Sequence, residues 1–165
     1  MDDVLIRDPS RSRDASARYA DYVRLHGRPR KLILVEQEQE LLKTGIVEFG
    51  LDLQETNEVL RGTADLCDTV LESQVEKHLQ THLTQPTNAR EARRAAKGRH
   101  QVDSISRRRF EAAVDFYQTL TRSALSRDEA RKRVKLMVQR MSLKAKRDWW
   151  RLGSRKWFNA IQTAA

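Results

Sequence analysis

The sequence predicts an all-α fold, and three observations lead to this prediction. Ala, Leu, Arg, Glu, Gln and Lys, which have the highest helix propensities, are abundant in the chain. Among 165 residues there are only 6 Gly and 3 Pro, so the chain offers few of the turn sequences that separate strands. Apolar residues recur at helical spacing in several segments, as at Leu71, Val75 and Leu79. We therefore expect helices packed around one core or two small ones.

Charged residues divide the chain into an acidic part and a basic part. The net charge is +9. Residues 1–31 hold 8 basic and 5 acidic residues, residues 32–83 hold 3 and 11, and residues 84–165 hold 21 and 7. We predict a mobile arm with a short helix at 1–31, an acidic N-terminal helical unit at 32–83, a basic linker at 84–101, and a basic C-terminal helical unit with a Trp-rich tail at 102–165. The sequence leaves open whether the two units pack as one domain.

Stop and start signals mark the helices expected in the first half. A helix over Arg13–His26 should end at Gly27, and a helix over 32–49 should end at Gly50. Asp52 and Glu55 have the spacing of a capping box, which predicts that another helix begins there. Gly62 within that helix is interpreted as a point of close helix packing, and a further helix is expected over 70–83.

The second half gives similar signals after the linker. Residues 84–101 lack a hydrophobic period, and Pro86 prevents a continuous helix. A helix is expected from about Ser104, a second capping box at Ser126 and Glu129 opens the next one, and a helical pattern runs over 144–163. No internal repeat of the solenoid kind is visible.

Basic residues on the last two predicted helices are the candidate binding site. Those at 147, 151 and 155 recur every four residues, which places them along one side of a continuous helix. Tryptophans interleave with them, and aromatic faces beside cations suit stacking on unpaired bases. We therefore expect nucleic-acid binding, DNA or RNA, through Arg127, Arg131, Lys132, Lys135, Arg147, Arg151 and Arg155, with Trp149 and Trp157 as stacking groups. Arg107, Arg108 and Arg109 extend this patch onto the start of an earlier helix, where positive charge opposes the helix dipole.

The same residues have plainer interpretations. Trp150, Trp157 and Ile161 lie at intervals of seven and four and fit core positions. The arginines could be solvated, or neutralised by carboxylates from residues 32–83. The alternative function is then a helical adaptor that binds another protein, such as one with an acidic surface, and has no nucleic-acid role.

Other classes of function find no support in the sequence. Cys67 is the only cysteine, which excludes an intramolecular disulfide and a cysteine-based zinc cluster. His78 and His82 are four residues apart but lack an HExxH pattern or an obvious third ligand. Neither a GxSxG elbow nor a phosphate-binding glycine loop is present. We predict no catalytic site, no metal, no cofactor and no membrane association, and a cytoplasmic location.

Overall fold

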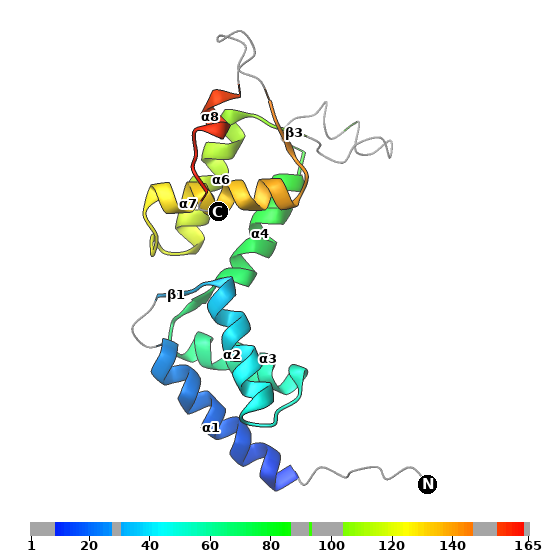
Figure 1. Ribbon diagram of the computed structural model, residues 1–165, viewed down its shortest axis with the longest axis vertical. Coiled ribbons are helices and arrows are strands. Elements are labelled where there is room, and N and C mark those ends of the chain that lie inside the picture. Colours follow the sequence, from blue (N-terminus) through cyan, green and yellow to red (C-terminus); the bar gives the residue numbers. More distant parts are fainter. Residues whose placement is uncertain (1–8, 28–30, 87–92, 94–103, 147–154, 164–165) are drawn as a thin grey trace. The chain divides into compact units, whose positions relative to one another are not determined.

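The computed structural model describes residues 9–27, 31–86, 93, 104–146 and 155–163. Over these residues the regular structure consists of seven helices and four two-residue strands, which confirms the all-α prediction (Figure 1). The chain divides into two compact units, Met1–Ser73 and Gln74–Ala165. This division falls in the first turn of α4 (Glu72–Thr84), ahead of the linker expected at 84–101, most of which lies outside the described residues.

Unit 1 contains three helices and a short parallel bridge. Its elements are α1 (Pro9–Gly27), β1 (Leu32–Ile33), α2 (Val35–Val47), α3 (Leu53–Leu66) and β2 (Val70–Leu71), followed by the start of α4. β1 pairs with β2 in parallel, with Leu32 opposite Val70 and Ile33 opposite Leu71. The helices expected from residues 32 and 70 therefore begin only at Val35 and Glu72, because the preceding aliphatic pairs form this bridge instead.

Gly45 is a point where three helices of unit 1 pack closely. A Cβ atom at this buried glycine of α2 would lie 2.4 Å from Cγ2 of Thr56 in α3 and 2.9 Å from Cζ of Tyr19 in α1. The Tyr19 hydroxyl donates to the Leu41 carbonyl at 2.9 Å, and burial raises the pKa of this phenol above its ordinary value. The interpretation of Gly62 as the packing glycine is wrong, because Gly62 is exposed and nothing lies within 4 Å of a Cβ there.

The helix ends of unit 1 are capped by both near and distant residues. At α3 the expected capping box is confirmed: Asp52 Oδ1 accepts from the Glu55 amide at 2.8 Å, and the Asp52 amide donates to Glu55 Oε2 at 3.2 Å. Gly50, just beyond α2, has φ +67°, as a stop residue there requires. At the start of α2 the buried carboxylate of Glu72 accepts from the Val35 amide at 3.0 Å. A carboxylate at a helix N-terminus is favoured by the helix dipole, so Glu72 fixes the start of a helix far away in sequence.

Unit 2 contains the rest of α4 and a second helical hairpin that is closed by a parallel bridge. Its elements are β3 (Ser104–Ile105), α6 (Arg107–Leu120), α7 (Arg127–Arg140), β4 (Lys144–Ala145) and α8 (Lys156–Asn159). β3 pairs with β4 in parallel, with Ser104 opposite Lys144 and Ile105 opposite Ala145. The helix expected over 144–163 is therefore wrong at its start, and within 155–163 only α8 is helical; residues 147–154 lie outside the described residues.

A buried arginine ties α6 to the end of α4 within unit 2. Arg109 Nη2 donates to the carbonyls of His82 at 3.3 Å and Leu83 at 2.8 Å, and also to that of Gln85. These carbonyls are at the C-terminus of α4, where the helix dipole favours positive charge. Arg109, which the sequence grouped with a surface patch, is 9% exposed and acts as a helix cap.

The two units share one order of elements, strand, helix, helix, strand. The second helix of each is capped by a side chain that accepts from the amide three residues on, Asp52 in unit 1 and Ser126 in unit 2. After each of these helices one residue has a positive φ, Asp68 at 55° and Ser142 at 56°, and the chain then enters the second strand. The repetition lies in the backbone path, and its period is longer than that of a solenoid repeat.

The glycines of unit 1 give a matched test of its packing. We expect Gly45→Ala to lower the free energy of unfolding by about 1–3 kcal/mol, because the added methyl overpacks the contact with Thr56 and Tyr19. Gly62→Ala should instead raise it by about 0.5–1 kcal/mol, since the methyl meets only solvent and alanine favours a helix. Urea denaturation of both variants measures the two changes. Equal effects of the two substitutions would contradict this description of the core.

Candidate functional site

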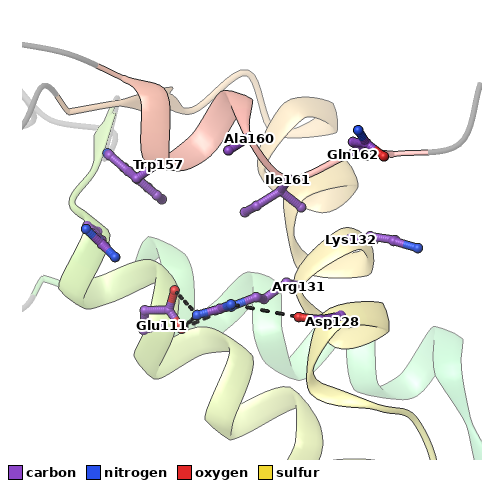
Figure 2. Close-up of a pocket in the computed structure, with 9 residues that line it drawn as sticks. Glu111, Asp128, Arg131, Lys132, Trp157, Ala160, Ile161 and Gln162 are labelled. Atoms are coloured by element: carbon purple, nitrogen blue, oxygen red, sulfur yellow. Dashed lines mark hydrogen bonds and ion pairs between the residues drawn. The ribbon is translucent and has the colours of Figure 1, made fainter.

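The arginines of α7 that the sequence singled out are paired with carboxylates of α6. Arg127 donates to Glu111 Oε2 at 3.1 Å and to Asp115 Oδ1 at 2.7 Å, and these hydrogen bonds raise the pKa of Arg127. Arg131 Nη2 lies 2.9 Å and 3.0 Å from the two oxygens of Glu111. One carboxylate thus serves two guanidinium groups, as Figure 2 shows for Arg131.

The remaining cations of α7 also have local partners. Lys132 Nζ lies 3.4 Å from Glu129, and Arg133 Nε lies 3.8 Å from the same side chain. Arg140 forms an ion pair with Glu76 of α4. Glu76 belongs to the acidic stretch 32–83, but most of the neutralising carboxylates come from the basic half itself. Opposite charges at these distances largely cancel each other's field, and salt screens what remains beyond about 8 Å at physiological ionic strength.

Lys135 is buried rather than presented to solvent. It is 7% exposed, its Nζ donates to the Ile161 carbonyl at 2.6 Å, and the same atom lies 5.3 Å from the centroid of the Phe158 ring. This lysine therefore holds the segment after α8 against α7.

Trp157 is half-buried and packs with two other aromatic rings. Its ring centroid lies 5.4 Å from those of Phe110 and Phe158, in edge-to-face geometry. The indole N–H donates to the Lys146 carbonyl at 3.3 Å. The indole is thus held in place by packing and by one hydrogen bond. Arg147, Trp149 and Arg151 lie outside the described residues.

Three of the predicted residues do meet, in a cleft of about 510 Å³ bounded by α6, α7 and the α8 segment (Figure 2). Arg131 and Lys132 of α7 line one wall and Trp157 lines another. The cleft is mixed in character, since acidic, basic and apolar side chains all reach it. Its other lining residues are Arg107, Glu111, Asp128, Ala160, Ile161 and Gln162.

A second group of cations lies around the β3–β4 bridge. Arg107 and Arg108 form the first turn of α6, directly after β3, and Lys144 lies opposite Ser104 in the bridge. The Lys146 amide donates to the Ile105 carbonyl at 2.8 Å, which fixes this residue beside β3. All four side chains are exposed, and none forms an ion pair with a carboxylate in the described part of the chain. Arg155, at the N-cap of α8, is also exposed and unpaired within those same residues.

The sequence around β4 contains a pattern of alternating residues that the prediction of a helix over 144–163 overlooked. In Leu143-Lys144-Ala145-Lys146 apolar and basic residues alternate, and the structure buries Leu143 and Ala145 while it exposes both lysines. Alternation with period two indicates a strand, but two residues of strand are too short for the pattern to stand out. We name the exposed set Arg107, Arg108, Lys144 and Lys146 the bridge cations.

Metal sites and membrane spans have requirements that the described residues do not meet. His82 stacks on Phe116, with ring centroids 4.8 Å apart. Within the described ranges no group of three or more His, Cys, Asp or Glu side chains is arranged to hold a metal ion. Nor does any described helix combine the length and the apolar character needed to cross a bilayer.

No protein-family model, no curated protein and no solved structure matches this chain.

The contact between Glu111 and Arg131 can be tested by its energetic coupling. A double-mutant cycle of Glu111→Gln and Arg131→Gln should report a coupling of about 0.5–1 kcal/mol, because the contact is bidentate and part-buried. The more exposed pair of Arg127 and Asp115 should couple less strongly in the same urea denaturation experiment. A coupling that is absent at low salt would show that Glu111 does not hold the arginine.

Proposed function

We propose that unit 2 binds single-stranded nucleic acid without strict sequence preference, through the bridge cations and the adjoining cleft. One observation carries the proposal: four exposed basic side chains, unpaired within the described chain, surround the β3–β4 bridge beside a cleft that contains Trp157. Arg107 belongs to both features. Exposed cations that have no internal carboxylate can neutralise phosphates and release the counterions bound there.

The arrangement suits a phosphate backbone with an unpaired base beside it. The bridge cations are spread over the first turn of α6 and residues 144–146, so they offer several separate contacts rather than one. The first turn of α6 adds amide groups and the positive end of a helix dipole, which favour a phosphate close to Arg107 and Arg108. In the cleft, Trp157 and Ile161 supply apolar surface against which a base can pack.

The sequence predicts that the cations of α7 contact phosphates, whereas in this proposal most of them stabilise unit 2. Arg127 and Arg131 hold α7 against α6 through Glu111, and Lys135 holds the α8 segment. Lys132 and Arg131 still line the cleft and contribute positive charge to its wall. Arg155 extends the exposed cations toward α8. The proposed role is non-catalytic and, as the sequence predicts, cytoplasmic.

Binding of a labelled oligothymidylate, followed by fluorescence anisotropy between 50 and 200 mM salt, tests the proposal. Replacing all four bridge cations by glutamine should reduce the slope of log affinity against log salt by roughly 3, since each contact to a single strand contributes about 0.7. The control replaces Arg24, Arg127, Arg133 and Arg140 by glutamine, which removes the same charge from carboxylate-paired sites that do not line the cleft. This control should change the slope much less, and circular dichroism checks that both variants fold.

Two results would overturn the proposal. One is an equal loss of slope in both variants, which would indicate a diffuse response to net charge. The other is binding by the wild-type protein that does not change with salt. A duplex of equal length, added as competitor, should displace the oligothymidylate poorly if an unpaired base enters the cleft.

A further inference from the structure

The cleft of unit 2 has two walls of different chemistry. Its five lining residues from α6 and α7 are all charged, whereas its four lining residues from the α8 segment, residues 155–163, are all uncharged. Trp157 and Ile161 supply the apolar surface of this second wall, and Figure 2 shows both side chains directed toward α6 and α7. A base that enters the cleft therefore packs against the α8 segment.

The position of the α8 segment depends on its contacts with the rest of unit 2. α8 itself is a single turn, Lys156–Asn159, and so short a helix is not stable in isolation. Its inner side is anchored by Phe158, which is 8% exposed and whose ring centroid lies 5.7 Å from that of Phe110. The residues after α8, which include Ile161, need an anchor of their own.

Lys135 of α7 provides that second anchor. Its Nζ donates to the Ile161 carbonyl at 2.6 Å and lies 5.3 Å from the centroid of the Phe158 ring, so one ammonium group contacts the segment at two points. A buried ammonium group requires hydrogen-bond acceptors in place of water, which keeps the side chain at this carbonyl. Lys135 is not one of the described residues that line the cleft.

We infer that Lys135 is a positioning residue, which determines how much the bases of a single strand contribute to binding. It holds Trp157 and Ile161 in the wall of the cleft and does not itself contact the ligand. This inference rests on the proposed function, in which the bridge cations bind the phosphates and the α8 segment packs against a base. A lysine in direct contact with phosphate, as the sequence predicts for Lys135, would instead contribute to the salt dependence of binding.

The test compares the affinity of the full chain for oligothymidylate with that for an abasic strand of the same length, measured by anisotropy. Both strands carry the same phosphates, so the ratio of the two affinities reports the contribution of the bases. The wild-type ratio should be about tenfold, as expected for one stacked base. Lys135→Met should reduce this ratio to less than about threefold and leave the slope of log affinity against log salt unchanged.

Arg140→Met is the matched control, because it removes one positive charge from α7 at a site that is paired with Glu76 and does not line the cleft. It should leave the ratio unchanged. Lys135→Met added to Trp157→Leu should lower the ratio no further than Trp157→Leu does, because both changes act on the same wall. Circular dichroism checks that each variant folds.

A second measurement needs no nucleic acid. In a protein with phenylalanine at positions 149 and 150, Trp157 is the one remaining tryptophan. Lys135→Met should increase the quenching of its fluorescence by acrylamide, because the indole is no longer held in the wall. Arg140→Met should not change the quenching.

Three results overturn the inference: Lys135→Met lowers the salt slope by about 0.7, as the loss of one phosphate contact would; a folded Lys135→Met variant keeps the wild-type ratio; or Arg140→Met lowers the ratio equally. Unchanged quenching of Trp157 in Lys135→Met also contradicts the positioning role. A wild-type protein that binds neither strand refutes the proposed function instead.

Discussion

Each unit depends on a parallel bridge of two residues per strand that joins the chain before one helix to the chain after the next. In unit 1 Leu32 and Ile33 pair with Val70 and Leu71, and in unit 2 Ser104 and Ile105 pair with Lys144 and Ala145. The bridge closes the helical hairpin, because it fixes the outer ends of both helices at the same place. The candidate site of unit 2 lies beside such a bridge, because its exposed cations surround β3 and β4.

Charged side chains at helix ends reinforce this arrangement. Glu72 accepts from the first amide of α2, and Arg109 donates to the last carbonyls of α4. Both side chains are buried, and a buried charge is tolerated only where hydrogen bonds replace its hydration. The fold therefore requires an acidic residue at position 72 and a basic residue at position 109. Because both side chains serve the fold, neither is available to bind a molecule outside the chain.

Pairing inside unit 2 separates its cations into two kinds. Glu111 contacts two arginines of α7, and Glu129 contacts a lysine and an arginine, so much of the positive charge of α7 is locally compensated. Around the β3–β4 bridge the described chain supplies no carboxylate partner for Arg107, Arg108, Lys144 or Lys146. The net charge counts paired and unpaired cations equally, whereas a phosphate is attracted mainly by the unpaired ones. The order of elements that the two units share thus carries opposite surface chemistry in each.

The sequence by itself determined the helical character, the capping box at Asp52, the cap at Ser126, the stop at Gly50 and the uneven distribution of charge. All of these depend on residues within a few positions of one another, where spacing and propensity act directly. Only the tertiary structure decided that Gly45 rather than Gly62 is the packing glycine, that Arg109 and Lys135 are buried, and that carboxylates of α6 neutralise the arginines of α7. It also placed Lys144 and Lys146 beside β3 and gathered Arg131, Lys132 and Trp157 into one cleft. These features join residues far apart along the chain, and no local pattern specifies which distant partner a side chain will meet.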